Sequence, residues 1–510
     1  MPLTNRLHLH AIDTPGAVAT VIGGQAVTYG VLAGRARRLD AIIAALPRQS
    51  RPQSDLGKVP VFGVLMGNHP QVVSFLAAAL AGRCCVVLLD PLLPTHQLVA
   101  ILDRLPPDIL FTAGQDIDQF QGRGFPVISI ESDDDLENLI AEAPDAPVPA
   151  PQDDDPFLVA FTSGTTSQPK AFARTRRSWR TSLDAGRGHF GIHADLHTLS
   201  PGPLAHGLSL YAFAETLDAG ATFHTLDRFT AEATWSALQD NNITRLVCVP
   251  SAIDALCRYD PTDKTPLEAL TQVTTSGAKL NDTLLERTAK IFPNATVTEY
   301  YGASELGFVT TVSHQPGPTR YTRGGSGVGR AFPGVDIDIR AFESNDPQDE
   351  AGTIWVRSDL MIDGYLWHDD NQAFQRQRDW ATVADIGRFT TGGDLELISR
   401  ANGMVISGGN NIYPEEINTC LRGHPAIAEA CVIGIPDAYL GKALVAVLKC
   451  EGDAPAKETL VRYCAQNLQK YKIPRQFFAV TAWPMTSSGK ISTGRLEEWI
   501  MQTDDRLVLL

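Results

Sequence analysis

The fold is decided in residues 59–105, which read VPVFGVLMGNHPQVVSFLAAALAGRCCVVLLDPLLPTHQLVAILDRL. Two apolar runs, 59–66 and 84–89, have the length and the valine-rich composition of buried strands. Each run is followed by a segment, 70–81 or 97–105, whose pattern predicts a helix. Strands that alternate with helices indicate βα units, and such units build a largely parallel sheet. We therefore predict an α/β fold.

The same alternation returns between about residues 208 and 300, with apolar strands such as 296–301. The chain has 510 residues, more than a single hydrophobic core accommodates, so we expect at least two domains. The strand pattern breaks at residues 401–403, and the segment that follows has an α+β alternation of its own. We predict a large N-terminal domain over residues 1–401 and a small C-terminal domain over residues 402–510.

Charge and cysteine usage limit the classes of protein that fit. The formal net charge of −15 argues against a nucleic-acid or membrane-surface binder, since either needs a basic face. None of the eight cysteines forms a Cys-x-x-Cys pair, so we expect buried, reduced thiols. The N-terminus has no signal-peptide core, and no apolar run reaches the roughly 20 residues of a membrane span. We expect a cytoplasmic protein without a membrane span.

Two polar segments are interpreted as exposed connections. Residues 142–156 are rich in proline and aspartate, which is typical of a linker. The acidic run Asp133–Asp135 is interpreted as a solvated loop, the usual role of a short charge run.

The strongest local signal is FTSGTTSQPK at residues 161–170, directly after the apolar strand 157–161. Hydroxyl groups and a glycine give a loop many donors and little bulk, and Lys170 adds positive charge, so the loop can wrap phosphate oxygens. It is not the Gly-x-x-x-x-Gly-Lys-Ser/Thr loop, because no glycine precedes the lysine. Alone, a loop rich in serine, threonine and glycine is more often a plain turn.

With its Pro169–Lys170 ending, this loop resembles the phosphate loop of the adenylate-forming superfamily. That superfamily contains acyl- and aryl-CoA ligases, firefly luciferase and the adenylation domains of nonribosomal peptide synthetases. Further segments resemble the family's motifs in the family's order: 27–29, 78–89, 203–208, 275–278, 300–305, 406–417 and 484–491. Each is weak alone, but the ordered set covers almost the whole chain and is specific. The resemblance implies a luciferase-like N-terminal domain and a mobile C-terminal domain that carries the catalytic lysine.

The resemblance also implies the reaction. A carboxylic acid is activated by ATP to an acyl-adenylate with release of pyrophosphate, and the acyl group then passes to coenzyme A. The cofactors and co-substrates would be ATP, Mg²⁺ and coenzyme A. Glu305 would hold the magnesium ion, Ser304 would donate to the α-phosphate, and Tyr301 would lie against the adenine. The full ATP- and AMP-binding set implied is Thr162, Ser163, Gly164, Thr165, Thr166, Lys170, Ser276, Gly277, Ala278, Tyr300, Tyr301, Gly302, Ser304, Asp385 and Arg400.

The ribose-binding aspartate has two candidates. Thr391-Gly-Gly-Asp394 looks like the family's Thr-Gly-Asp, but Asp394 precedes Arg400 by only six residues. Asp385 precedes Arg400 by fifteen residues, which is the family's spacing. We therefore assign Asp385 and Arg400 to the ribose, and we predict a hairpin turn at Gly392–Asp394.

The C-terminal domain supplies the remaining residues implied by the resemblance. Lys490 would bridge the acid and the phosphate during adenylation, and Asn402 stands at the family's hinge, where aspartate or lysine is usual. Ser407, Gly408 and Gly409 would line the pantetheine tunnel of coenzyme A. Three basic residues are candidates for the coenzyme's phosphates, with plain surface charge as an equal alternative: Lys442, Lys472 and Arg475.

The acid pocket implied by the resemblance comprises His206, Gly207, Gly277, Ala278 and Gly302. This segment lacks the acidic side chain that an α-amino acid would require, so we expect an acyl or aryl acid. His206 would shape the pocket or the pantetheine exit and belong to the catalytic set, although a lone histidine is often a satisfied core residue.

Alternatives remain for the acceptor and for activity. A separate carrier protein could replace coenzyme A, but we find neither a fused carrier domain nor the insertion of fatty-acyl-AMP ligases near residues 335–365. Ser167 and Ala171 stand where the family commonly has glycine, and with Asn402 they are the only support for an inactive binding protein. The acid and the oligomeric state stay open.

Overall fold

The computed structural model describes residues 5–52, 56–114, 117–144, 150–162, 170–240, 242–260, 265–316, 327–341, 351–367, 374–400, 405–407, 410–412, 414–437, 440–468, 470–486 and 491–510. The chain forms two compact units. The first comprises Met1–Asp336 with Val356–Ala381, and the second comprises Ile337–Trp355 with Thr382–Leu510. The predicted domain boundary at residues 401–402 lies outside the described residues and stays a prediction.

The larger sheet of the first unit has nine strands in the order β15-β14-β13-β12-β11-β9-β10-β1-β2. Its inner strands, from β13 to β1, run parallel, and antiparallel strands flank them on both sides. The strands are β1 (Val18–Ile22), β2 (Gln25–Thr28), β9 (His197–Leu199), β10 (Thr222–Thr225), β11 (Arg245–Val247), β12 (Gln272–Ser276), β13 (Thr296–Ala303), β14 (Gly307–His314) and β15 (Arg330–Ala331).

The second sheet of this unit has seven strands in the order β18-β8-β7-β4-β3-β5-β6. The strands from β7 to β6 are parallel, which confirms the sheet predicted from residues 59–105. The strands are β3 (Val61–Leu65), β4 (Cys85–Leu88), β5 (Ile109–Thr112), β6 (Val127–Ser129), β7 (Pro156–Thr162), β8 (Lys170–Thr175) and β18 (Tyr365–Trp367).

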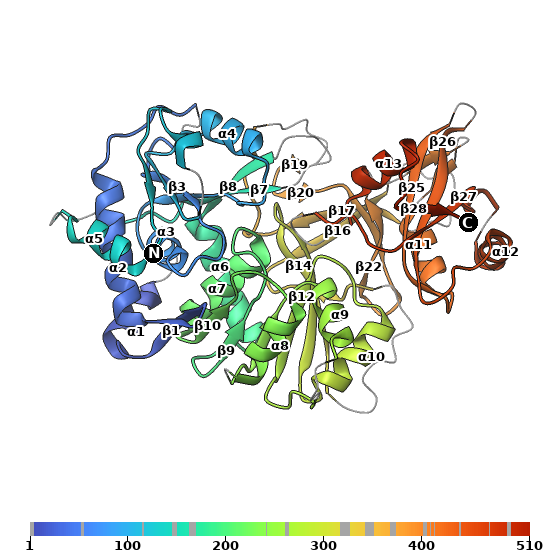
Figure 1. Ribbon diagram of the computed structural model, residues 1–510, viewed down its shortest axis with the longest axis horizontal. Coiled ribbons are helices and arrows are strands. Elements are labelled where there is room, and N and C mark those ends of the chain that lie inside the picture. Colours follow the sequence, from blue (N-terminus) through green and yellow to red (C-terminus); the bar gives the residue numbers. More distant parts are fainter. Residues whose placement is uncertain are drawn as a thin grey trace. The chain divides into compact units, whose positions relative to one another are not determined.

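Helices pack between and beside these sheets. They are α1 (Asn5–Asp13), α2 (Tyr29–Ala45), α3 (Val72–Ala81), α4 (Thr95–Arg104), α5 (Asp133–Ala141), α6 (Arg176–His189), α7 (Gly207–Ala219), α8 (Ala231–Asp240), α9 (Pro250–Arg258) and α10 (Asp282–Ile291), with a 3₁₀ turn η1 at Ile117–Phe120. Side chains of α8, α9 and α10 form one apolar cluster with β9, β11, β12 and β13, so these helices cover one face of the larger sheet (Figure 1). That face is closed to water over the strands that lead to the predicted adenine segments.

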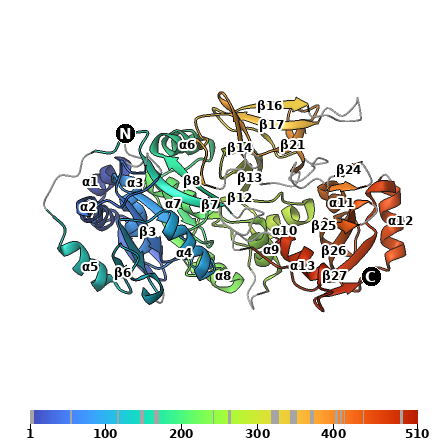
Figure 2. The ribbon, with the colours of Figure 1, turned by 90° about the horizontal axis from the view of Figure 1, so that it is seen from above.

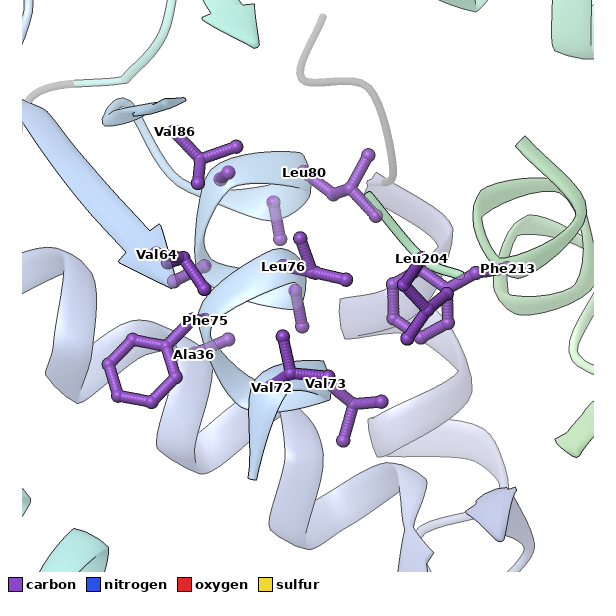
Figure 3. Close-up of a cluster of buried hydrophobic side chains, with 14 of the residues drawn as sticks. Ala36, Val64, Val72, Val73, Phe75, Leu76, Leu80, Val86, Leu204 and Phe213 are labelled. Carbon is purple, nitrogen blue, oxygen red and sulfur yellow. The ribbon is translucent and has the colours of Figure 1, made fainter. Parts of the chain in front are cut away.

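Helix α3 is the centre of the main core. All ten of its residues are buried, which explains why its sequence is apolar on every side rather than on one stripe. Figure 3 shows Leu76 and Leu80 of this helix in a cluster that includes Leu204 and Phe213. The same cluster takes in Val64 of β3, so one core joins the two sheets of the first unit.

The acidic run at Asp133–Asp135 was wrongly interpreted as a loop. It forms the first turn of α5, and Ser132 is the N-cap in a capping box with Asp135. Carboxylates in a first turn are favourable because the helix dipole is positive there and the free backbone N–H groups need acceptors. Asp133 also accepts a hydrogen bond of 2.7 Å from Arg35 of α2, whose side chain is buried.

The second unit contains most of a six-stranded sheet, with the order β19-β20-β17-β21-β22 and with β16 beside β17. These strands are β16 (Asp336–Ala341), β17 (Gly352–Arg357), β19 (Gln375–Gln377), β20 (Trp380–Thr382), β21 (Asp385–Phe389) and β22 (Leu395–Arg400). Thr390 donates its backbone N–H to Asp394 over 2.8 Å between β21 and β22, which confirms the predicted turn at Gly392–Asp394.

A mixed sheet follows in the second unit, in the order β24-β23-β26-β27-β28 with β25 beside β26. Helices α11 and α12 cover one of its faces and α13 covers the other, as the two apolar clusters and Figure 2 show. The elements are β23 (Val405–Ser407), β24 (Asn410–Ile412), α11 (Pro414–Arg422), β25 (Ile427–Asp437), β26 (Gly441–Cys450), α12 (Lys457–Asn467), η3 (Lys470–Lys472), β27 (Gln476–Val480), α13 (Thr493–Met501) and β28 (Leu507–Leu509). In the described ranges, every helix is too short or too polar to cross a bilayer.

Candidate active site

The predicted phosphate loop joins two paired strand ends. Thr162 ends β7 and pairs with Lys170, which begins β8, so residues 163–169 connect two neighbouring strands of one hairpin. Ser163, Gly164, Thr165 and Thr166 lie outside the described residues, as does Ser167. Lys170 is buried, and its Nζ lies 5.3 Å from the ring centroid of Tyr365.

Glu305 lies beside this lysine–tyrosine pair. The hydroxyl of Tyr365 donates to Oε1 of Glu305, and the Glu305 side chain is buried. The backbone N–H of Ile362 donates to the carbonyl of Glu305 over 2.9 Å. One ammonium, one phenol and one carboxylate, from strands far apart in the sequence, therefore converge at the turn between β13 and β14.

This turn is held by Arg174 of β8. Its guanidinium donates to the backbone carbonyls of Ser304 and Leu360. Burial lowers the pKa of Arg174 to about 10, and the charge of Glu305 opposes that shift. Gly302 allows the tight approach of the two strands, since a Cβ there would lie 2.3 Å from the carbonyl oxygen of Gly307. Ser304 is exposed at the tip of the turn.

A magnesium ion fits this chemistry. Among the described residues, no three histidine, cysteine, aspartate or glutamate side chains converge in a way that could hold a metal by themselves. Mg²⁺ is commonly bound by one or two carboxylates together with phosphate oxygens, so Glu305 with ATP supplies a suitable donor set.

The predicted adenine segments occupy the ends of β12 and β13. Ser276 pairs with Tyr300 in the parallel ladder, and its hydroxyl donates to the Tyr300 carbonyl over 2.9 Å. Gly277 has a φ of +98°, which favours glycine, and Ala278 is exposed beside it. Tyr301 follows on β13 and is half-buried. The structure thus brings both predicted segments to one end of the sheet.

Glu299 fixes the loop between these segments and α10. One of its oxygens accepts from the backbone N–H of Leu280 over 2.7 Å, and the other lies 2.8 Å from Nε2 of His314. Both side chains are buried on adjacent antiparallel strands.

His206 is the N-cap residue of α7, and Gly207 begins that helix. The imidazole Nε2 of His206 lies 3.2 Å from Oδ2 of Asp90, a buried carboxylate just after β4. Asn68 braces the same segment, because its side chain donates to the carbonyls of Gly202 and Leu226 and accepts from the backbone N–H of Leu204. Asn68 therefore fixes the segment that precedes His206, and Asp90 lies beside its imidazole.

The predicted ribose pair lies in the β21–β22 hairpin. Asp385 is buried at the start of β21, and its Cα pairs with that of Arg400 at the end of β22. Asp394, the rejected candidate, lies in the turn at the other end of the same hairpin.

The predicted coenzyme residues are only partly described. Ser407 is buried on β23 and pairs with Gly441. Lys442 and Arg475 are exposed, whereas Lys472 forms an ion pair of 2.7 Å with Glu416 of α11. Asn402, Gly408, Gly409 and Lys490 lie outside the described residues, so their predicted roles stay predictions.

Sequence reasoning missed five residues that build this site: Asn68, Asp90, Arg174, Glu299 and Tyr365. Asp90 directly follows a buried strand, and Glu299 lies within one. Charged residues are rarely buried without a partner, so a carboxylate in or next to an apolar strand could have indicated both residues from the sequence. Arg174 lies within the buried strand β8 and offered the same signal, whereas Tyr365 carries none, because its partner Glu305 lies 60 residues away along the chain.

Two family models match the chain. The AMP-binding enzyme model matches residues 7–366, and the AMP-binding enzyme C-terminal domain model matches residues 416–490. Among known proteins, an uncharacterised acyl-CoA ligase of Bacillus subtilis, YhfT, is 31% identical over 504 residues, which are 99% of both chains. A 2-succinylbenzoate–CoA ligase of Arabidopsis thaliana is 29% identical over 68% of each chain.

Solved structures agree in fold. The o-succinylbenzoate CoA synthetase of Bacillus subtilis, in complex with its acyl-adenylate intermediate, is 26% identical, covers 98% of each chain and has a TM-score of 0.80. ATP-bound MatB of Rhodopseudomonas palustris, at 21% identity and 99% coverage of both chains, has a TM-score of 0.85 and shows the fold alone. The family models, the full-length relative and the shared fold agree: this chain belongs to the family of AMP-binding enzymes.

Proposed function

We infer that the chain is an AMP-forming acid–thiol ligase that activates a carboxylic acid with ATP and transfers the acyl group to coenzyme A. The observation that carries this inference is the convergence of Lys170, Tyr365 and Glu305 at the β13–β14 turn, next to the ends of the phosphate loop. This cluster offers one cation for a phosphate and one carboxylate for a hard metal ion.

The first half-reaction joins the acid to the nucleotide. A carboxylate oxygen attacks the α-phosphorus of ATP, the bond to the β-phosphate oxygen breaks, and pyrophosphate leaves with the electron pair. Such a step depends on positioning and on neutralising the phosphate oxygens. We assign the donors to the loop hydroxyls with Lys170 and Ser304, and the adenine face to Tyr301. When bound, Mg²⁺ would neutralise phosphate charge beside Glu305.

The second half-reaction moves the acyl group. The thiol sulfur of coenzyme A attacks the acyl carbon, AMP leaves with its phosphate oxygen, and the thiol proton is released. We assign Asp385 and Arg400 to the ribose and Lys490 to the first half-reaction only. Ser407, with Gly408 and Gly409, would line the pantetheine path.

Coenzyme A is the favoured acceptor because the relatives that match the chain over most of its length are named CoA ligases. A separate carrier protein remains the second candidate. A cytoplasmic location stays a proposal, supported by free cysteines of which five are buried.

The test is ATP–pyrophosphate exchange over a panel of fatty, aryl and dicarboxylic acids, followed by thioester formation with coenzyme A. We expect exchange with at least one acid and a thioester with coenzyme A. In Lys490→Ala, the rate of ATP–pyrophosphate exchange should fall by a factor on the order of 10²–10³. The variant should still transfer the acyl group from a supplied acyl-adenylate to coenzyme A.

Three outcomes would contradict parts of this proposal. Exchange with no acid would favour an inactive binding protein. Exchange without a coenzyme A thioester, but with loading of a carrier protein, would change the acceptor. Equal loss of both half-reactions in Lys490→Ala would remove the assignment of that lysine.

A further inference from the structure

Glu299 and His314 form a buried pair that joins β13 to β14. Nε2 of His314 lies 2.8 Å from Oε1 of Glu299, and both side chains are buried. The other carboxylate oxygen of Glu299, Oε2, accepts the backbone N–H of Leu280 over 2.7 Å. Leu280 is itself buried, at the end of the loop that follows β12. Each oxygen of this carboxylate therefore has a partner, and one of these partners belongs to the loop.

The pair lies on the same side of the sheet as Tyr301. Glu299 and Tyr301 are two residues apart on β13, and such residues point to the same face of a strand. Val297, two residues before Glu299, belongs to the apolar cluster that α10 covers. His314 is opposite Val297 in the antiparallel ladder, so it lies on that face as well. Glu299, His314 and Tyr301 therefore share the face that carries α10.

The loop at residues 277–280 is held near both of its ends. Before it, the hydroxyl of Ser276 donates to the carbonyl of Tyr300 over 2.9 Å. At its end, the N–H of Leu280 is held by Glu299. The residues between these two points are exposed. The position of this exposed stretch over β13 therefore depends on the hydrogen bonds at its two ends.

The bond to Glu299 is the one whose loss would move the loop. A buried backbone N–H without an acceptor is costly, so Leu280 would either keep an unpaired donor or turn towards water. The carboxylate in turn needs donors, because a buried charge without partners is unfavourable. His314 lies against the second oxygen, and the loop is thus coupled to β14 through Glu299.

We propose that Glu299 and His314 are a positioning pair that sets the 277–280 loop over the adenine of ATP and thereby sets the affinity for the nucleotide. This inference rests on the proposed function, which assigns this loop and Tyr301 to the adenine. Glu299 acts through the backbone of Leu280, since its two oxygens are engaged by Leu280 and His314. The pyrophosphate part of ATP carries no adenine, so its binding should not depend on the pair.

The test compares Glu299→Ala with wild type in ATP–pyrophosphate exchange and in calorimetric titration with AMP. The KM for ATP and the Kd for AMP should each rise by about tenfold, a factor that corresponds to leaving one buried donor unpaired. The kcat should change little, because the adenine contact is equally strong in the ground state and in the transition state. The KM for pyrophosphate should also stay near the wild-type value.

Two further variants separate positioning from folding. In Glu299→Gln the amide oxygen still accepts the N–H of Leu280, so the KM for ATP and the Kd for AMP should stay close to wild type. In His314→Leu the carboxylate loses its second partner, so both constants should rise, though less than in Glu299→Ala. His314→Leu also carries the comparison if Glu299→Ala does not fold.

Asp40→Ala is the matched control, because Asp40 is a buried carboxylate that accepts the backbone N–H groups of Arg83 and Cys84 in another loop of the first unit. It should lower thermal stability and leave the constants for ATP and AMP unchanged. An unchanged Kd for AMP in folded Glu299→Ala, a rise that Asp40→Ala or Glu299→Gln shares in full, or no AMP binding by wild type would overturn the proposal. Exchange with no acid in a wild type that still binds AMP would instead reject the proposed function.

Discussion

At the scale of single residues, Cys420 of α11 differs from the other cysteines. Its thiol interacts with that of Cys464 on α12, and the hydrogen bond from Cys464 lowers the pKa of Cys420. Burial raises the pKa of Cys85 to about 12 and that of Cys84 well above its usual range. The thiolate is the reactive form of cysteine. We therefore expect the partly exposed Cys420, whose pKa is lowered, to be more reactive than the buried cysteines.

We therefore predict that iodoacetamide at pH 7.5 modifies Cys420 first in the native protein. Cys450 is the internal control, since it is also half-buried but burial raises its pKa. Mass spectrometry of tryptic peptides over time gives both rates, and Cys420→Ser should remove the fast phase. Faster labelling of Cys450 or of Cys257 would contradict the prediction.

At the scale of elements, two arginines of α6 clamp the end of α7. Arg180 donates to Oδ1 of Asp218 over 2.7 Å, Arg187 donates to the other oxygen, and the Asp218 side chain is buried. Burial acts to raise the pKa of Asp218, but the hydrogen bonds and charges of Arg180 and Arg187 outweigh it, so the pKa is lowered. The clamp holds the helix whose first turn carries the predicted acid pocket.

The substitution Asp218→Asn should lower the free energy of unfolding by about 3–5 kcal/mol at pH 7, because it leaves two arginines beside a neutral group in a buried site. A lowered pKa stabilises the fold above the ordinary value of 3.8, and this contribution is lost as the pH falls through the folded value. The urea midpoints of unfolding of wild type and of Asp218→Asn should therefore approach each other as the pH falls below about 4.

Asp184→Asn serves as the control, since Asp184 pairs with the same Arg180 but is exposed. The substitution Asp184→Asn should lower the free energy of unfolding by less than about 1 kcal/mol. A similar cost for both variants, or a difference that grows as the pH falls, would show that Asp218 is not the centre of the clamp.

At the scale of the whole molecule, the two compact units have separate hydrophobic cores. The main core around α3 belongs to the first unit, and the clusters beneath α11, α12 and α13 belong to the second. We predict two transitions in differential scanning calorimetry of the full chain. ATP with Mg²⁺ at 100 times its Kd should stabilise the unit that carries the phosphate loop by about 2.7 kcal/mol.

The second transition should also move, because Asp385 and Arg400, which we assign to the ribose, belong to that unit. AMP without Mg²⁺ is a suitable comparison and should give a smaller shift. A single transition that moves as a whole would show that the units unfold cooperatively.

Much of the fold followed from the sequence because its signals are local. The valine-rich runs of β3 and β4, and the helices after them, lie within a residue or two of their predicted ends. The turn at Gly392–Asp394 was also predicted from nearby residues, and it joins the two strands on which Asp385 and Arg400 pair. The signal that corrects Asp133–Asp135 is also local, because the capping box joins Ser132 to Asp135 within four consecutive residues.

By itself, the sequence determined the order of strands and helices, the family and the positions of its motifs, since each depends on residues close together along the chain. Only the tertiary structure decided which distant side chains meet. It joined Tyr365 to Glu305 and Arg174 to the carbonyl of Ser304, and it brought Tyr211 against Phe308. These contacts depend on strand order and helix packing, so no periodicity or spacing in the sequence reveals them.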